Sequence, residues 1–229
     1  MVNPLAVALD TDDRAEIDRL VDALEPVTGM FKIGLTAFTS LGPEVVPAVS
    51  ARRPVFLDLK LHDIPAQVTG AVDAAGRLGA GYITVHASGG PEMLAAAAAA
   101  AAEHLTVLAV TILTSLDDAA LARVGFALPP EKAVLQLADL AVEAGLRGLV
   151  CSPLDVAAVR GRFGSVADGG PLLVVPGIRP GAPGDDQRRT STARAALEAG
   201  ADILVVGRPI TRAADPAEAA RRLLADLRR

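Results

Sequence analysis

The chain has 229 residues, of which 51% are hydrophobic and 21% charged, so it can form one larger globular domain such as an α/β barrel, or two small ones. Its 22 basic and 27 acidic residues give a formal net charge of −5, which argues against a nucleic-acid-binding surface but allows a local phosphate site. The single cysteine, Cys151, excludes an intramolecular disulfide and a cysteine-based zinc site.

In the first half of the chain, short apolar runs typical of buried strands alternate with segments typical of helices. The first helix begins after Asp12 or Asp13, either of which can cap it, and Pro91 opens an alanine-rich scaffold helix. In chain order we expect a strand at 5–10, a helix to about 24, a strand at 30–34, a short helix from about 43, a strand at 55–59, a helix at 65–78, a strand at 82–86 and a helix at 91–102.

The second half of the chain continues the same alternation. Its one long irregular segment is rich in Gly, Pro and Asp, which are residues typical of loops. In chain order we expect a strand at 105–111, a short helical piece near 117–124, a helix at 131–143, a strand at 148–151, a helix at 153–160, a strand at 172–175, the loop 178–188, a helix at 190–198, a strand at 203–207 and a helix at 215–227.

This alternation predicts the fold class. Apolar strands that recur about every 25 residues, with helices between them, are typical of parallel βαβ units. Eight such strands in a chain of 229 residues favour a closed (β/α)8 barrel, the TIM barrel, over an open doubly wound sheet. Because no linker interrupts the pattern, we expect residues 1–229 to form a single barrel domain.

The sequence also predicts where the protein is located. No apolar run approaches the roughly 18 residues that a membrane-spanning helix needs. The start of the chain has no basic segment followed by an apolar core, so we expect no signal peptide. We therefore expect a cytoplasmic protein that binds neither membrane nor nucleic acid.

Charged residues cluster at the end of the third expected strand. Asp58 and Lys60 are two positions apart, so they would share one face of an extended strand, and Asp63 follows in the next loop. An ion pair removed from water costs about what it returns, so a structural protein has little reason to place one there. We interpret the three residues as a catalytic cluster, with an ordinary ion pair at the barrel mouth as the alternative.

Other polar residues also fall at strand ends, where the active site of such a barrel lies. Asp10 ends the first strand, although it could merely cap the first helix, and Lys32 lies near the end of the second. His86 ends the fourth strand and Thr114 follows the fifth. We interpret His86 as a packed residue near the site rather than a catalyst.

The loops after the seventh and eighth strands have the composition of a phosphate site. Barrels commonly hold a phosphate there, glycine lets backbone N–H groups approach an anion, and arginine offers a bidentate fork. These loops carry Gly177, Arg179, Gln187, Gly207 and Arg208. The residues alone thus predict a barrel enzyme that acts on a phosphorylated small molecule through a Lys/Asp cluster.

The motif Asp58-x-Lys60-x-x-Asp63-Ile64-Pro65 resembles the signature of the orotidine 5'-monophosphate decarboxylase family, in its compact bacterial form. Any one short match would be weak, but several occur in the same order and at strand ends across essentially the whole chain. The others lie at 9–10, 31–34, 85–90, 113–115, 176–179, 186–188 and 206–211.

The resemblance implies a reaction in which orotidine monophosphate loses CO₂ to give uridine monophosphate, with no metal and no organic cofactor. It implies that Lys60 donates a proton to C6 of the pyrimidine and that Asp58 lies against the substrate carboxylate. Lys32 would bridge Asp58 and the ribose. Asp63 would enter the active site of the other subunit, which implies a homodimer with two shared sites.

The resemblance also implies the remaining substrate contacts. Asp10 would bind ribose hydroxyls, Thr114 the amide edge of the pyrimidine, and Pro176 would form part of the pocket wall. The phosphate would be held within the last two loops, and the loop 178–188 would close over it. The expected phosphate contacts are Arg179, Gln187, Gly207 and Arg208.

One main departure, a minor one at Val175 where threonine is frequent, and two alternatives remain. The family commonly has a threonine that reaches the partner's substrate ribose where this chain has Gln67, so that contact is not assigned. A related enzyme could share Asp-x-Lys-x-x-Asp and act on sugar phosphates through Mg²⁺, but such enzymes usually lack the Ile-Pro that follows here. A nucleotide-sensing protein without activity would be expected to have lost Asp58 or Lys60, and both are present.

Overall fold

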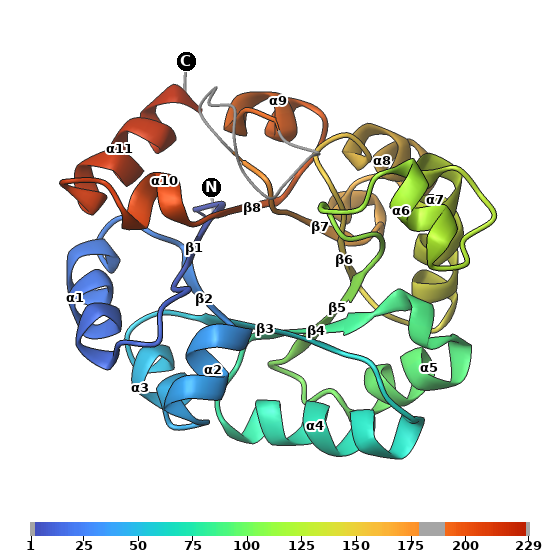
Figure 1. Ribbon diagram of the computed structural model, residues 1–229, viewed down its shortest axis with the longest axis horizontal. Helices are drawn as coiled ribbons and strands as arrows, with labels where there is room; N and C mark the ends of the chain where they lie inside the picture. Colours follow the sequence, from blue (N-terminus) through green and yellow to red (C-terminus); the bar gives the residue numbers. More distant parts are fainter. Residues whose placement is uncertain (1–2, 179–190, 228–229) are drawn as a thin grey trace.

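Eight parallel strands close into a barrel in the computed structural model, which describes residues 3–178 and 191–227 (Figure 1). Each strand pairs with the next along the chain, and the last pairs with the first. The expected TIM barrel is therefore confirmed. The strands are β1 (Leu5–Ala8), β2 (Met30–Gly34), β3 (Val55–Leu61), β4 (Tyr82–His86), β5 (Thr106–Val110), β6 (Gly148–Val150), β7 (Leu172–Val175) and β8 (Ile203–Val206).

Helices cover the outside of the barrel (Figure 1). In chain order they are α1 (Arg14–Leu24), α2 (Leu35–Leu41), α3 (Val45–Ser50), α4 (Pro65–Arg77), α5 (Pro91–Ala100), α6 (Asp118–Arg123), α7 (Pro130–Glu143), α8 (Val156–Phe163), α9 (Ala193–Glu198), α10 (Arg208–Thr211) and α11 (Pro216–Asp226), with short 3-10 turns η1 (Ala87–Gly89) and η2 (Val166–Asp168).

Local signals in the sequence start several of these helices. The side chain of Asp13 accepts the backbone N–H of Ala15 at the start of α1, and Asp215 accepts that of Glu218 at the start of α11. Such contacts satisfy N–H groups that have no partner within the helix. Proline suits the first turn for the same reason, because it lacks that N–H. Prolines in this position are Pro65, Pro91, Pro130, Pro209 and Pro216.

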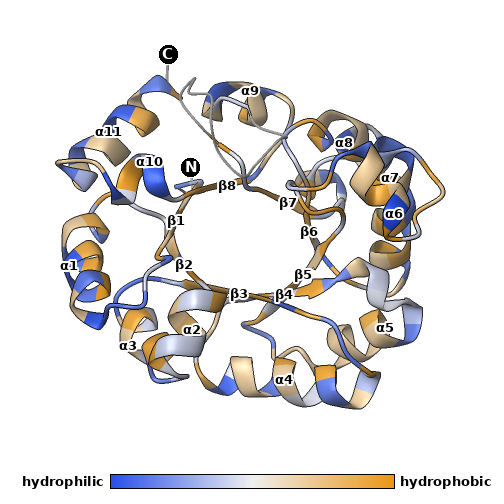
Figure 2. Cartoon of the chain, viewed as in Figure 1, coloured by the Kyte–Doolittle hydropathy of each residue, from blue (hydrophilic) through white to orange (hydrophobic). Residues whose placement is uncertain are grey.

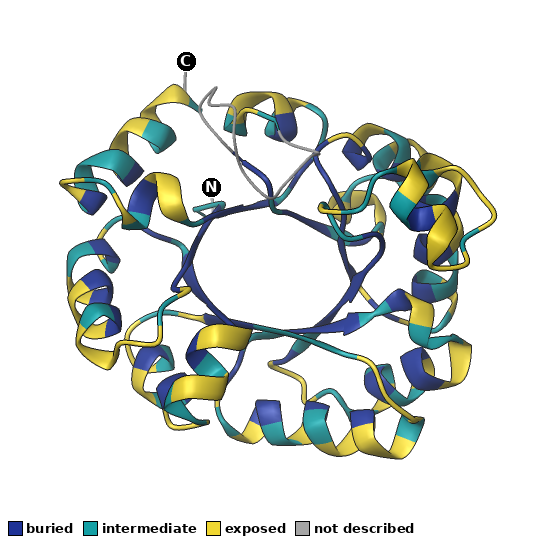
Figure 3. Ribbon diagram, viewed as in Figure 1, coloured by how far each residue is buried: buried dark blue, intermediate teal, exposed yellow. Residues whose placement is uncertain are grey.

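The apolar strands separate two hydrophobic cores. An inner core fills the barrel with side chains such as Ala6, Met30, Phe56 and Val174. An outer core lies between the strands and the helices. The strands are accordingly buried, and the helices turn a polar, exposed face to the solvent (Figures 2 and 3). Burial on both faces explains why the strands are continuous apolar runs.

The sequence predicted the strands more closely than the helices. The strands at 30–34, 82–86 and 172–175 have the predicted bounds. Helix α2 was not anticipated, since its cap is Gly34 and no side chain caps it. The helix expected at 153–160 begins later, at Val156, because Asp155 donates its backbone N–H to the Ser152 carbonyl in a preceding turn.

Across residues 3–178 and 191–227, none of the helices has the length and apolar character that a membrane span requires.

Candidate active site

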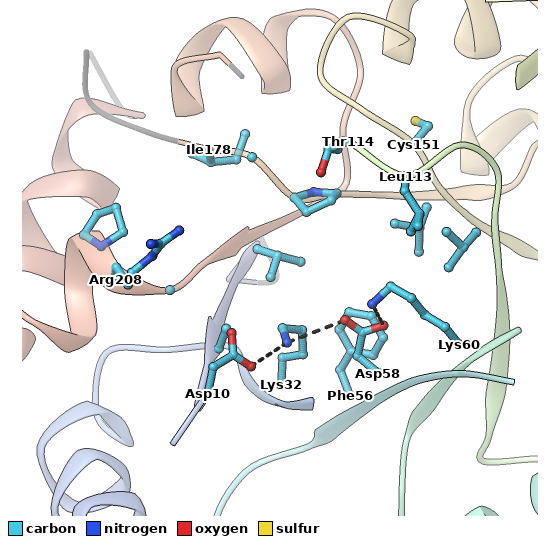
Figure 4. Close-up of a pocket in the computed structure, with 18 of the residues that line it drawn as sticks. Asp10, Lys32, Phe56, Asp58, Lys60, Leu113, Thr114, Cys151, Ile178 and Arg208 are labelled. Atoms are coloured by element: carbon cyan, nitrogen blue, oxygen red, sulfur yellow. Dashed lines mark hydrogen bonds and ion pairs between the residues drawn. The ribbon is translucent and has the colours of Figure 1, made fainter. Parts of the chain in front are cut away.

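A cavity of about 470 Å³ opens where the strands of the barrel end at their C-terminal sides (Figure 4). Charged side chains that follow or belong to β1, β2 and β3 line one side of it. Apolar side chains of the barrel strands also line it. This end of a TIM barrel is where its enzymes carry their active sites.

Four charged residues form a continuous chain of alternating sign across the cavity (Figure 4). The Nζ of Lys32 lies 3.0 Å from Oδ1 of Asp10 and 3.5 Å from Oδ2 of Asp58. The Nζ of Lys60 lies 2.8 Å from Oδ1 of Asp58. Asp58 is thus shared by two lysines, and Lys60 forms the end of the chain that faces the apolar wall.

The charge state of Asp58 follows from these contacts. Burial alone would raise the pKa of this carboxyl, since its side chain is only 13% exposed. The ammonium groups of Lys32 and Lys60 outweigh burial, together with hydrogen bonds to the carboxylate, so that its pKa lies below the ordinary value. Asp58 is therefore an anion at neutral pH.

The backbone around Lys60 is not a regular strand. Leu57 pairs with Ile83 and Leu61 pairs with Val85, so that four steps along β3 match only two along β4. Lys60 has a φ of +52°, in the left-handed region, and is the one non-glycine residue with positive φ in the part of the chain that the structure describes. The expected proximity of Asp58 and Lys60 is therefore found, but a bulge produces it rather than plain alternation.

The Lys32–Asp10 contact depends on a glycine that sequence reasoning missed. Gly34 ends β2, and a Cβ added there would lie 2.7 Å from Oδ1 of Asp10 and 3.0 Å from Nζ of Lys32. Any side chain at this position would push the two charged groups away. A glycine at the end of the second strand was the signal in the sequence that could have indicated the close approach of Asp10 and Lys32.

The wall opposite the charged residues is mostly apolar. Figure 4 shows Leu113 and the thiol of Cys151 there, and Val110 and Val150 also line the cavity. Two residues expected in the site, Thr114 and Pro176, line the same cavity. The cavity therefore offers an apolar surface and the hydroxyl group of Thr114 to a ligand that extends from the charged side.

The residues after β8 line the cavity across from Lys60. Gly207 and Arg208 contribute there, and Figure 4 shows the guanidinium of Arg208 on the far side of the cavity from the Lys60 ammonium. A ligand that touched both groups would span the cavity. This separation suits a molecule with its reacting centre at one end and an anionic group at the other.

One expected site residue of the described chain, Asp63, is not among the residues that line the cavity. Asp63 is exposed, and its Oδ1 accepts the backbone N–H of Ile64 at 2.7 Å. Arg179 and Gln187 lie outside the described residues. Among the residues that the structure describes, no ion pair joins Asp63 to Lys60.

His86 lies beside the site rather than in it. Its ring centroid is 5.5 Å from that of His62, and it does not line the cavity. Burial lowers the pKa of His86, and the nearby charges of His62 and Lys60 lower it further. His86 is therefore neutral at neutral pH, and its place outside the cavity lining agrees with a packed residue near the site.

Known proteins resemble the chain over nearly its full length. The model of the family described as "Orotidine 5'-phosphate decarboxylase / HUMPS family" matches residues 3–223. A protein named orotidine 5'-phosphate decarboxylase from Anaeromyxobacter sp. (strain K) is 53% identical over 225 residues, which cover 97% of this chain and 97% of the relative. One of the same name from Thermobifida fusca (strain YX) is 50% identical over 232 residues, which cover 100% of this chain and 97% of the relative.

A solved structure shows the same architecture. The crystal structure of orotidine 5'-phosphate decarboxylase from Lactobacillus acidophilus matches with a TM-score of 0.86 at 34% sequence identity. The match covers 99% of this chain and 100% of that chain.

Proposed function

The chain belongs to the orotidine 5'-phosphate decarboxylase / HUMPS family, and we infer that it converts orotidine 5'-monophosphate into uridine 5'-monophosphate, the last step of de novo pyrimidine synthesis. The observation in the site that carries this function is the ammonium of Lys60, which Asp58 holds at 2.8 Å in a cavity with an apolar wall. An oriented cation is what a reaction that develops a carbanion requires.

We propose that Lys60 is the proton donor. The bond between C6 and the carboxylate carbon breaks, CO₂ leaves, and the electron pair stays on C6. The ammonium of Lys60 stabilises this charge and then transfers a proton to C6. Because one side chain performs both tasks, the proposed mechanism calls for no metal ion and no organic cofactor.

We propose that the other charged residues hold the substrate around Lys60. Asp58 lies against the substrate carboxylate, and this like-charge contact disappears as CO₂ leaves. Lys32 bridges Asp58 to the ribose, and Asp10 binds ribose hydroxyls. Their continuous chain of contacts supports these roles, because each charge orients the next.

We propose the remaining contacts from the family resemblance, and the positions of four of the residues around the cavity support them. Thr114 binds the amide edge of the pyrimidine, and Pro176 packs against the ring. Gly207 and Arg208 hold the phosphate at the far side, together with residues of the last loops that lie outside the described residues, Arg179 and Gln187. The energy of binding this remote phosphate can be used to order the site around the reacting carbon.

We propose that the enzyme is a homodimer in which Asp63 enters the partner's site. Asp63 is exposed, and the adjacent Ile64 is 63% exposed, so both side chains are open to contact with a second subunit. We also propose that residues 1–229 act as one catalytic domain in the cytoplasm. A multiply charged substrate does not cross a lipid bilayer unaided, which supports that location.

The direct test is the loss of the orotate absorbance band when purified protein meets orotidine 5'-monophosphate in the presence of EDTA. Wild type and Lys132→Ala should consume the substrate rapidly, because Lys132 is an exposed residue of α7. Lys60→Ala should not. If the wild type leaves the absorbance unchanged, the decarboxylase function is refuted, and sugar phosphates with Mg²⁺ should be tested as substrates. Equal loss in Lys60→Ala would keep the reaction but refute the role of Lys60.

A further inference from the structure

We propose that Thr84 is a positioning residue, whose single hydroxyl group fixes both the backbone of Lys60 and the carboxylate of Asp58. This inference rests on the proposed function, because it assumes the roles given above to Lys60 and Asp58. Thr84 does not line the cavity, so it acts through these two residues and not on the substrate.

The hydroxyl of Thr84 makes one contact with each residue. Thr84 lies in the middle of β4 and is completely buried. Its Oγ1 accepts the backbone N–H of Lys60 at 2.8 Å and donates to Oδ1 of Asp58 at 3.0 Å. A hydroxyl group has a single proton to donate. The proton of Thr84 is therefore directed at Asp58 while a lone pair receives Lys60.

The backbone of Lys60 needs such a partner because of the bulge. The regular pairing of β3 with β4 is interrupted between Leu57 and Leu61, and Thr84 lies opposite this interruption. A left-handed backbone is unfavourable for a lysine and persists only where its surroundings hold it. The side chain of Thr84 takes the Lys60 N–H in place of a regular strand partner.

The carboxylate of Asp58 is oriented by the same group. Its Oδ1 accepts from both Nζ of Lys60 and Oγ1 of Thr84, which leaves Oδ2 to face Nζ of Lys32 at 3.5 Å. Without the hydroxyl, the carboxylate of Asp58 can rotate about its Cβ–Cγ bond, and the ammonium of Lys60 moves with it. Displacement of a reacting group by about 1 Å can lower a rate about 100-fold.

The test compares two substitutions of Thr84 with a matched substitution elsewhere. Thr84→Val keeps the shape but loses the hydroxyl, whereas Thr84→Ser keeps the hydroxyl. The control is Thr28→Val, since Thr28 is also buried and its hydroxyl contacts the carbonyls of Leu5 at the start of β1 and Met30 at the start of β2, away from the cavity. We expect Thr84→Val to lower kcat about 10- to 100-fold with little change in KM. Thr84→Ser and Thr28→Val should stay within about threefold of wild type.

The pH profile gives a readout that a purely structural role would not move. Asp58 faces Lys32 from β2, Lys60 from β3 and His86 from β4. The hydrogen bond from Thr84 favours the charged form of Asp58, so its loss raises the pKa of that carboxyl. The acid limb of kcat/KM should therefore move to higher pH in Thr84→Val, and it should stay in place in Thr84→Ser.

The kinetics of the Thr84 variants decide whether its hydroxyl positions Lys60 and Asp58. Thr84→Val with the kcat of wild type would overturn the proposal, and so would an equal fall in Thr84→Val and Thr84→Ser, which would assign the effect to packing. If Thr84→Val fails to fold by circular dichroism, Thr84→Cys replaces it, because a thiol is a weak donor. A Thr84→Cys enzyme as fast as Thr84→Ser would then overturn the proposal. An inactive wild type would refute the decarboxylase function instead.

Discussion

The Nζ of Lys60 lies 2.8 Å from Oδ1 of Asp58, across a part of β3 that does not pair regularly with its neighbour. The ion pair is therefore formed by a bulge and not by the alternation of a regular strand. Its members are also partly buried, with side-chain exposures of 29% and 13%. An ion pair in this setting is weakly screened by solvent, so removal of one member strongly affects the other.

Asp58→Asn should lower kcat by about 100-fold or more, because the amide leaves the ammonium of Lys60 without the charge that orients it. Steady-state kinetics with orotidine 5'-monophosphate measures the effect. Asp139→Asn is a suitable control, since Asp139 pairs with Arg162 on the surface and should leave kcat unchanged. An Asp58→Asn enzyme within threefold of wild type would contradict the proposed arrangement.

The ionisation of Asp58 should also appear in the stability of the protein. Its pKa in the folded state lies below the ordinary value of about 3.9. Such a group contributes stability above its unfolded pKa, and the contribution is lost as the pH falls through the folded pKa. The difference in unfolding free energy between wild type and Asp58→Asn should be constant above about pH 5. Below about pH 4 the wild type should lose stability relative to Asp58→Asn. Urea titrations at several pH values measure it, and a difference that does not vary with pH would refute the expectation.

Gly34→Ala should damage the site without straining the backbone. The φ of Gly34 is −96°, which alanine adopts readily, but the added Cβ would meet the Asp10–Lys32 pair. We expect kcat/KM to fall about tenfold or more, with a smaller change in melting temperature. Gly161→Ala in α8 is the control, because a Cβ there meets nothing within 4 Å. Equal activity of the two variants would show that the pair tolerates displacement.

Arg160→Lys should lower stability but not activity. The Arg160 guanidinium donates to the carbonyls of Gly164, Pro171 and Gly200 and to the carboxylate of Asp202. These contacts tie together the segments that enter β7 and β8, at the barrel end opposite the cavity. A lysine cannot donate to all of these oxygens, because its single ammonium lacks the several N–H groups of the planar guanidinium. We therefore expect a loss of about 2–4 kcal/mol in unfolding free energy. Chemical denaturation measures this loss. A fall in kcat of the folded variant would contradict the separation of the two ends.

The proposed sharing of sites between subunits can be tested by complementation. Lys60→Ala and Asp63→Ala should each be nearly inactive alone. Co-expression forms mixed dimers in which one of the two sites has both wild-type residues, so about a quarter of wild-type activity should return. No recovery from co-expressed subunits, or a monomer in light scattering, would refute the placement of Asp63 in a partner's site.

The positions of the charged residues could be predicted from the sequence because strand ends in a closed parallel barrel meet at one place. Asp10, Lys32 and Asp58 each end or follow an apolar run, and the structure brings them together in one cavity. The closeness of Asp58 and Lys60 was predicted correctly for an incorrect reason, since alternation along a regular strand does not hold there.

Thr84 could not be found from the sequence for the same reason. It is one polar residue within an apolar strand, and nothing in its neighbours indicates a bond to residues 24 and 26 positions earlier. That contact depends on the interrupted register between β3 and β4, which hydrophobic alternation does not encode. Helix α2 was missed because it has no capping side chain, and packing against the barrel defines it instead.

The inner core of the barrel is also the floor of the cavity. Five of its side chains line both, namely Ala8, Phe56, Val110, Val150 and Val205. A change in their size alters the depth of the site and the packing of the barrel together. The outer core lies behind the strands, where substitutions can accumulate without reaching a bound nucleotide. Substitutions are therefore expected to accumulate more slowly in the inner core than in the outer core between strands and helices. The depth of the site should stay the same while the outer core changes.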